Sequence, residues 1–234
     1  MSNRDYYELR AYRLKSDAGH ELLDEYLAKA AIPALNRVGV KNVGAFTEPE
    51  AKDGPAVWVL IAYPSLDLFS TAAARLNADS DYQKAGEKYL QVMKEQAAFD
   101  RIDSWLLLAF SGMPRLEVPA LTRDKKARIF EMRTYESYSE VKALKKVEMF
   151  NSGEIDVMHE VGLSPVFYGQ ALIGRDLPHL TYMLCGENKD VHKKHFSDFG
   201  KHPTWNKLKN DPQYADTVSK ITSRFLEPTA YSQI

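Results

Sequence analysis

The alternation of apolar and polar positions repeats in two short segments of the chain, residues 7–12 and 130–135. Each segment reads aromatic, Glu, apolar, Arg, small, Tyr. Side chains of a strand point alternately to the two faces of its sheet, so Glu, Arg and Tyr share one face in each segment. These residues, here called the first and second triplet, are Glu8, Arg10 and Tyr12, and Glu131, Arg133 and Tyr135. Their recurrence predicts two strands with a common structural or chemical use.

The pattern beyond these segments predicts the same series of elements in both halves. Apolar positions from Leu22 to Val38 recur at helical spacing, and Pro33 is expected to bend this helix and Gly39 to end it. The first half is expected to hold a strand at 5–14, this helix, strands at 42–48 and 56–63, a helix after Ser65, further helix over 82–99 and a strand at 102–110. The second half is expected to hold a strand at 129–135, a helix to Val161, strands at 166–173 and 180–185, helical segments over 190–220 and a strand at 223–232.

The order of these elements is strand, helix, strand, strand, helix, strand, and it occurs twice. Apolar, glycine and aromatic positions match at a constant offset of 123 residues (130 against 7), which predicts a duplication. We expect a first repeat at 1–110, a linker rich in proline and charge at 111–127, and a second repeat at 128–234. This is the ferredoxin-like order, a four-stranded antiparallel sheet with its helices on one face. The fold class is therefore α+β, with two ferredoxin-like repeats whose open sheet faces cover each other.

Composition and charge narrow the classes of partner. The net charge of −1 gives no reason to expect nucleic acid or an anionic membrane surface as a partner, and no apolar run reaches the length of a membrane span. The first residues lack the apolar core of a signal peptide, which favours a cytoplasmic location, or a secreted or periplasmic one if a leader was removed. Cys185 is the single cysteine and lies in an apolar run, so we expect a buried, inert thiol.

Several stretches of the sequence resemble the NIPSNAP family. They are the two segments at 7–12 and 130–135, Asp79–Tyr82, His202–Trp205, and the closing Ser223–Pro228 with Tyr231 and Ser232. The resemblance extends over essentially the whole chain as two tandem domains. It implies the dimeric α/β-barrel architecture, here formed within one chain as a pseudo-dimer. The family carries no agreed enzymatic activity, and other members of this superfamily include cofactor-free monooxygenases and heme enzymes.

The two triplets are the candidate ligand-binding residues. We expect both to face the space between the two sheets, since the opposite face of each strand should lie under helices. Buried charges need partners, so each Glu is expected to pair with an Arg. One interpretation is a polar pocket for a small carboxylate or carbonyl compound, with Arg as clamp and Glu or Tyr as acid or base. The other, which we favour, is an ion-pair network that holds the halves in register.

Three histidines, His192, His195 and His202, lie close together in the sequence. His192 and His195 could share a helix face and bind a metal with Asp198 or Glu187 as a third ligand. Lysines separate them and the first repeat lacks counterparts, so a solvated helix face is the favoured interpretation. No metal and no redox or heme cofactor is therefore expected.

Two functions remain open at this stage. The first is a binding or interaction protein with a largely structural barrel core. The alternative is a cofactor-independent small-molecule enzyme, similar to a monooxygenase or an isomerase, that uses the triplets. A hollow inter-sheet space of roughly 300 Å³ or more would favour a small organic ligand, and a filled one a structural role. Further homo-oligomerisation is compatible with either.

Overall fold

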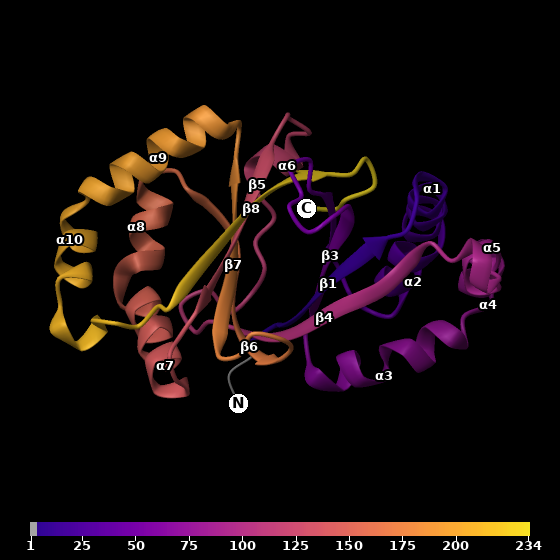
Figure 1. Cartoon of the computed structure of the whole chain (residues 1–234), viewed down its shortest axis with the longest axis horizontal. Coiled ribbons are helices and arrows are strands. Elements are labelled where there is room, and N and C mark those ends of the chain that lie inside the picture. Colours follow the sequence, from indigo (N-terminus) through magenta and orange to yellow (C-terminus); the bar gives the residue numbers. More distant parts are fainter. Residues whose placement is uncertain (1–3) are drawn as a thin grey trace.

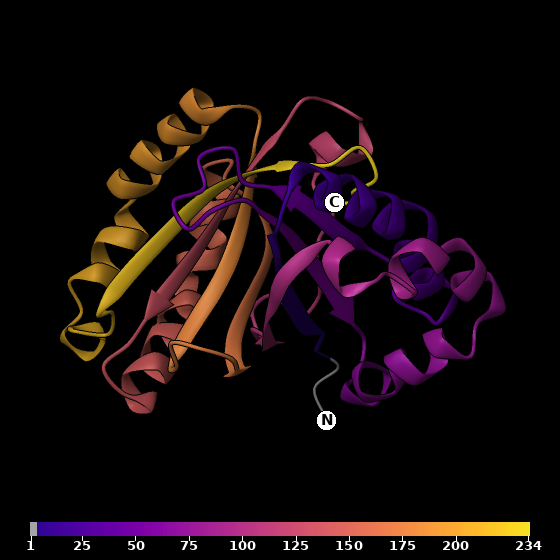
Figure 2. The ribbon, with the colours of Figure 1, turned by 45° about the vertical axis from the view of Figure 1, so that its right-hand side comes forward.

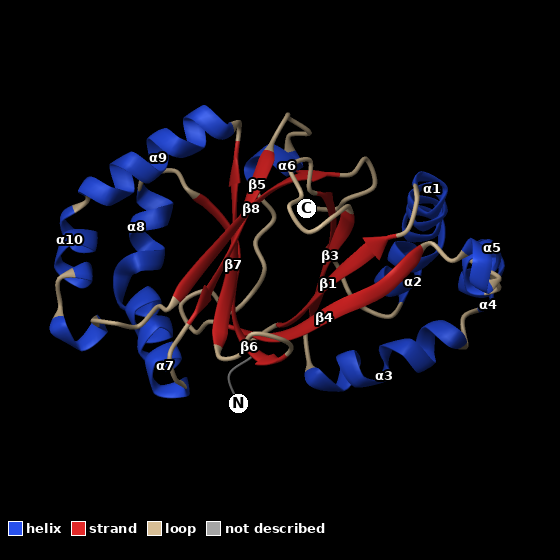
Figure 3. Cartoon of the chain, in the orientation of Figure 1, coloured by secondary structure: helices blue, strands red, loops and turns tan. Residues whose placement is uncertain are grey.

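The computed structural model describes residues 4–234, and its strands close into one antiparallel barrel with the helices outside (Figures 1 and 3). The strands are β1 (Tyr6–Leu14), β2 (Val43–Thr47), β3 (Ala56–Tyr63), β4 (Phe99–Ala109), β5 (Ile129–Glu136), β6 (Ser164–Ile173), β7 (His179–Gly186) and β8 (Lys220–Pro228). The helices are α1 (Asp17–Tyr26), α2 (Ile32–Arg37), α3 (Leu66–Asn77), α4 (Ser80–Ala85), α5 (Glu87–Leu90), α6 (Ala120–Arg123), α7 (Glu140–Met149), α8 (Ile155–Glu160), α9 (Lys189–Lys201) and α10 (Pro203–Lys209). Short 3₁₀ turns lie at Lys94–Gln96 and Pro212–Tyr214.

Each half contributes four neighbouring strands to the barrel. Their order is β4-β1-β3-β2 in the first half and β8-β5-β7-β6 in the second, which is the same ferredoxin-like order. The halves join where β2 pairs with β8 and β4 pairs with β6. In sequence order, the last strand of each half therefore hydrogen-bonds to the second strand of the other half. Figure 2 shows the strands of both halves between two outer groups of helices. The predicted fold class, an intramolecular dimeric α/β barrel, is confirmed.

One end of the barrel interior is filled by apolar side chains from both halves. Tyr7, Phe46, Phe130 and Phe167 are fully buried there, and the C-terminal Ile234 packs against them. The Cys185 thiol belongs to this cluster, and its burial raises the pKa of the thiol to about 12. This end is therefore a solid core, and any internal space must lie toward the other end.

The first long helix of each half is interrupted at the same place. A π turn separates α1 from α2 at Leu27–Ala31, whereas α7 and α8 are separated by a kink within Phe150–Glu154, where Gly153 has a φ of 132°, outside the helical region. Pro33 follows the first turn, but Asp156 stands at the corresponding place in the second half. The interruption thus falls at the same place in both repeats but differs in kind, with a π turn next to Pro33 in the first repeat and a kink at Gly153 in the second.

The segment between the repeats packs against the barrel. The backbone N–H of Asp5 donates to the carbonyl of Pro114, that of Glu117 donates to Val166, and Met113 is buried. The segment also includes the short helix α6. The boundaries assigned to a linker and two domains stay a prediction. Within residues 4–234, none of the helices is long and apolar enough to cross a membrane.

Candidate functional site

Both triplets lie on the outer face of the barrel, beneath the helices, and the prediction that they face the inter-sheet space is wrong. Tyr12 belongs to the core between the first sheet and its helices, whereas Leu9 belongs to the barrel interior. Tyr135 likewise packs under the helices of the second half, and Met132 points inward. Both faces of these strands are buried, so alternation alone did not reveal which face is the inner one.

The first triplet forms the expected ion pair within one strand. Arg10 binds Glu8 through two hydrogen bonds, Nε to Oε1 at 2.7 Å and Nη2 to Oε2 at 2.8 Å. Arg10 Nη1 also donates to the Tyr12 hydroxyl at 3.3 Å. Burial alone would disfavour the charge of Arg10, but Tyr12 and Glu8 raise its pKa well above the ordinary value. The guanidinium is therefore a permanently charged group under the helices.

The second triplet forms a larger network that includes a histidine. Arg133 Nη1 donates to Glu131 at 2.7 Å, and His192 Nε2 lies 2.9 Å from the other oxygen of that carboxylate. The Ser223 hydroxyl donates to Glu131 as well. Although burial alone would raise the pKa of Glu131, the bond from His192 and the charge of Arg133 lower it. The triplets thus form two separate networks, one in each half.

The solvated interpretation of the histidines is wrong for His192. Its side chain is 2% exposed, because α9 places it over the sheet against Glu131. His202 instead ends α9 and accepts a hydrogen bond from the backbone of Thr204, at the start of α10. Across residues 4–234 no group of three His, Cys, Asp or Glu side chains is placed to hold a metal ion. Whether the triplets bind a ligand stays a prediction.

A buried ion pair that the sequence analysis did not anticipate lies beside the second triplet. Lys146 Nζ is 2.8 Å from Glu154 Oε2, and the two side chains are 5% and 2% exposed. The ammonium also lies over the rings of Phe150 and Trp205, at 4.6 and 5.5 Å from their centroids. Burial is the largest influence on Glu154 and raises the pKa of its carboxyl. The only sequence signal was the pair of charges inside an otherwise apolar helix stripe.

The space between the two halves is hollow at the end of the barrel opposite the apolar core. The cavity has a volume of about 660 Å³, well above the 300 Å³ that would favour a ligand. We call it the mouth cavity. Its wall includes Leu9, Arg13, Glu48, Asp53, Trp58, Trp105, Met132, Thr134, Glu136, Arg175, His179, Thr181, Lys220, Thr222 and Arg224. These residues come from both repeats, so the mouth cavity exists only in the assembled barrel.

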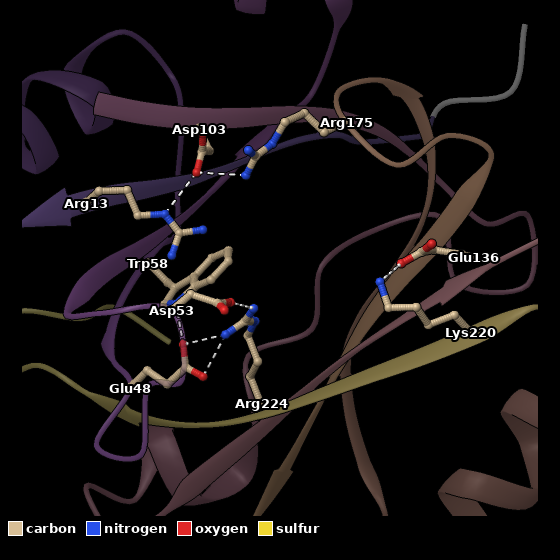
Figure 4. Close-up of polar contacts among 9 residues, drawn as sticks. All are labelled: Arg13, Glu48, Asp53, Trp58, Asp103, Glu136, Arg175, Lys220 and Arg224. Atoms are coloured by element: carbon tan, nitrogen blue, oxygen red, sulfur yellow. Dashed lines mark hydrogen bonds and ion pairs between the residues drawn. The ribbon is translucent and has the colours of Figure 1, made fainter. Parts of the chain in front are cut away.

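Two tryptophans form the apolar part of the wall. The rings of Trp58 on β3 and Trp105 on β4 stack with their centroids 6.0 Å apart. The guanidinium of Arg13 lies 5.6 Å from the Trp58 ring, that of Arg224 lies 5.3 Å from the same ring, and Arg175 lies 5.9 Å from Trp105. Figure 4 shows Trp58 between Arg13 and Arg224. The mouth cavity therefore combines flat apolar surface with guanidinium groups.

The arginines and carboxylates of the mouth cavity do not pair one to one. Arg13 Nε and Arg175 Nη2 both bind one oxygen of Asp103, at 2.9 and 3.0 Å, so two cations share one carboxylate. On the opposite side of Trp58, Arg224 binds both Glu48 and Asp53. Two guanidinium groups thus share one carboxylate at Asp103, and two carboxylates share one guanidinium group at Arg224 (Figure 4), while Asp176 next to Arg175 also lines the cavity.

The pair across the cavity is simpler. Lys220 binds Glu136 at 2.8 Å and lies on the far side from Arg13 (Figure 4). It leaves neither charge in excess, which makes it a matched reference for variants of the arginine side.

Two buried nitrogen atoms of the lining residues have no hydrogen-bond partner within residues 4–234. They are Nη1 of Arg13 and Nε2 of His179. His179 is 3% exposed, and its Nδ1 lies 3.4 Å from the Thr181 hydroxyl. Burial lowers the pKa of His179, so its imidazole is neutral at neutral pH. An unsatisfied buried polar atom carries a free-energy cost, and such atoms are frequent at functional sites.

The residues of this site were missed because they are far apart in the sequence. The one local signal was the series Leu9, Ala11, Arg13, which continues the inner face of β1 to its polar end. The partners of Arg13 come from other strands and loops, and only barrel closure brings them together.

Comparisons with known proteins address the family and the fold. The family model described as NIPSNAP matches residues 7–106 and 130–233. No curated protein matches the chain significantly.

Solved structures of similar fold cover nearly the whole chain. A protein from Lactobacillus acidophilus described as a "putative monooxygenase" has a TM-score of 0.63 and 8% identity, with 96% of this chain and 94% of that one covered. One with the same description from Fusobacterium nucleatum subsp. nucleatum has a TM-score of 0.60 and 10% identity, covering 97% and 94%. An anthrone oxidase-like protein has a TM-score of 0.55 and 10% identity, covering 97% and 92%. At these identities the likeness shows a common fold alone.

Proposed function

This chain belongs to the NIPSNAP family, with one family domain in each half, and from that premise we propose that it is a binding protein whose ligand is a small aromatic carboxylate held in the mouth cavity. The family itself carries no agreed activity, so the proposal rests on the geometry of the mouth cavity. The observation that carries it is the sharing of the single Asp103 carboxylate by Arg13 and Arg175 beside a stacked tryptophan pair.

The arginine pair accounts for the negative charge of the ligand. Asp103 neutralises one of the two guanidinium groups, and Arg13 has a nitrogen with no partner in the described residues. The side chain of Arg175 is 58% exposed, which leaves donors free toward solvent. A carboxylate matches the paired donors of a guanidinium, and in a partly enclosed site such a bond is stronger than in water.

The tryptophans account for a flat apolar body. A ring placed beside Trp58 or Trp105 would replace water on their exposed surface, and aromatic groups gain from offset or edge contacts beyond simple burial. The volume of about 660 Å³ accommodates a ligand of drug-like size. The barrel has a solid apolar core at one end and, under this proposal, a ligand site at the other.

Tryptophan fluorescence tests the proposal directly. Titration with 2-naphthoate is expected to change the emission of Trp58 and Trp105, and Trp105→Phe is expected to reduce that change. Arg175→Gln removes a guanidinium donor, but Asp103 keeps its ion pair with Arg13. This variant should weaken the binding of 2-naphthoate at least tenfold. Lys220→Gln, on the opposite wall, is the matched control and should leave the affinity within about twofold.

The proposal fails if the Arg175 and Lys220 variants bind 2-naphthoate as well as the native protein does. It also fails if the uncharged 2-ethylnaphthalene gives the same fluorescence change at the same concentration.

A cofactor-independent enzyme is the second candidate, and His179 is the observation that favours it. A neutral imidazole in the cavity wall is suited to accept a proton from a carbon acid. The similarity in fold to an anthrone oxidase-like protein suggests anthrone as a probe. Its reaction with O₂ to give anthraquinone and water consumes one O₂ for each anthrone. Oxygen uptake that falls in His179→Gln would support this candidate, and a rate equal to that without protein would dismiss it.

A further inference from the structure

We propose a second binding site, in the first repeat alone, for a neutral apolar molecule that carries a carbonyl oxygen. A cavity of about 360 Å³ lies between the outer face of the first sheet and the helices that cover it. We call it the helix-side cavity. Its wall is mostly apolar and includes Glu8, Arg10, Tyr12, Tyr26, Ala31 and Ala72. Because the mouth cavity lies inside the barrel, the wall of β1 and β3 separates the two sites.

The second repeat shows why this space is hollow in the first. Glu154 stands 123 residues after Ala31, and Lys146 stands 123 residues after Leu23. In the second repeat this ion pair and the ring of Trp205 occupy the space beside Arg133. In the first repeat the methyl group of Ala31 leaves that space open next to Arg10. At this place the second repeat is therefore filled by side chains that include an ion pair, whereas the first repeat has an open space without these charges.

At the polar end of the helix-side cavity, both carboxylate oxygens of Glu8 already accept hydrogen bonds from protein groups. The two oxygens of Glu8 accept from Arg10 Nε and Nη2, from the Tyr63 hydroxyl at 3.2 Å and from the Ser104 hydroxyl at 3.2 Å. A carboxylate with these partners has little capacity for a further donor. A ligand that needs a strong acceptor would find none here.

Donors, in contrast, are left over. A guanidinium carries five N–H groups, and Arg10 uses three of them on Glu8 and Tyr12. The Tyr12 hydroxyl accepts from Arg10, so its own proton is free. The hydroxyls of Tyr26 and Tyr82 are 2.8 Å apart, and one of them donates its proton to the other. The proton of the accepting hydroxyl remains available for a ligand. Burial raises the pKa of Tyr26, so that phenol stays protonated at neutral pH. This excess of donors matches the lone pairs of a carbonyl oxygen.

The charge balance favours a neutral ligand over a carboxylate. Glu8 and Arg10 neutralise each other, and no other charged side chain belongs to the wall of this cavity within residues 4–234. Arg10 is 32% exposed although it lies under the helices, because part of its surface faces the cavity. The second repeat, which does hold a carboxylate at this place, supplies Lys146 with it. An anionic ligand in the first repeat would lack that compensating cation.

Three probes of matched shape separate the chemical classes, and isothermal titration calorimetry measures their binding to the full chain. The probes are 2-acetylnaphthalene, 2-ethylnaphthalene and 2-naphthoate. The ketone is expected to bind the native protein at least tenfold more tightly than the hydrocarbon. Ala31→Leu fills the cavity and should weaken ketone binding at least tenfold. Ala72→Leu fills it from another helix and should act in the same way, which guards against a folding defect in either variant.

Arg175→Gln is the control, because it alters only the mouth cavity and should leave ketone binding unchanged. Equal affinity for ketone and hydrocarbon would overturn the proposal, and so would ketone binding that both filled variants retain. Binding of 2-naphthoate that is lost in Ala31→Leu would assign the cavity to anions and would also refute it. Failure of this site leaves the mouth-cavity proposal untouched, since that proposal depends on Arg175 and not on Ala31.

Discussion

Replacement of Lys146 tests whether the folded protein depends on this lysine to compensate the buried charge of Glu154. Lys146→Met keeps an unbranched side chain of similar length over the rings of Phe150 and Trp205. It takes away the cation 2.8 Å from Glu154, whose side chain is 2% exposed. The carboxyl must then either remain charged without its partner or take up a proton.

Protonation sets the expected magnitude. Each unit between the pH and the pKa of a carboxyl corresponds to about 1.36 kcal/mol, so protonating a group with the ordinary value of 4.5 costs about 3.4 kcal/mol at pH 7. The same cost is about 0.7 kcal/mol at pH 5. Truncating one partner of a buried pair costs about 3–5 kcal/mol in general, which agrees with the figure at pH 7.

The sign of the pH dependence follows from the direction of the shift. Burial raises the pKa of Glu154 in the folded state, so its contribution to stability is complete below about pH 4.5 and is lost as the pH rises through the folded-state value. Lys146→Met raises that pKa further. The loss of stability relative to the native protein should therefore grow from less than about 1 kcal/mol at pH 5 to about 2–3 kcal/mol at pH 7.

Urea denaturation followed by far-ultraviolet circular dichroism at pH 5 and pH 7 measures both values. Lys146→Met combined with Glu154→Gln is the control, and its stability should vary less with pH than that of the single variant. A second control copies the first repeat, with Lys146→Leu and Glu154→Ala. A loss in Lys146→Met below about 0.5 kcal/mol at pH 7, or one equal at both pH values, would refute the reasoning.

Three further outcomes follow from the same structure. His192→Ala removes one of the three side chains bonded to the buried Glu131 carboxylate, which keeps Arg133 and Ser223, and should lower the free energy of unfolding by about 1–3 kcal/mol, whereas His195→Ala should change it by less than about 0.5 kcal/mol; equal effects in urea denaturation would contradict this. Residues 1–111 expressed alone expose the inner sheet face and should self-associate in size-exclusion chromatography, and a well-behaved monomer would count against the pseudo-dimer. Cys185 should react with a thiol reagent only after unfolding, because its burial raises the pKa of the thiol to about 12; rapid labelling of the native protein would show access to the apolar core.

The predicted strands and helices agree with the structure because the signals for them are local. The spacing of two along β1 and β5, the helical stripe from Leu22 to Val38, and the cap at Ser65 depend on residues a few positions apart. The offset of 123 residues then indicated that the second half repeats the first. Together these observations were enough to predict two sheets whose open faces cover each other, and the resemblance to the NIPSNAP family implied that they form a barrel.

These patterns could not show which face of each strand points into the barrel and which lies under the helices. The alternation separated Glu8 and Arg10 from Leu9, but a strand of a closed barrel under helices is buried on both sides. The apolar side faces the barrel interior and fills one end of it with packed side chains. The charged side lies under the helices, where Tyr63 and Ser104 satisfy the carboxylate.

The amino-acid sequence by itself therefore determined the repeat, the order of the elements and the need for each Glu of the triplets to pair with an Arg. Only the tertiary structure decided where the hollow spaces lie and which side chains line them. The wall of the mouth cavity joins Arg13 to Arg175, and these residues meet because β1 and the end of β6 reach the same rim through β4. Periodicity records the faces of one element, whereas a cavity depends on side chains from many elements that come together only when the barrel closes.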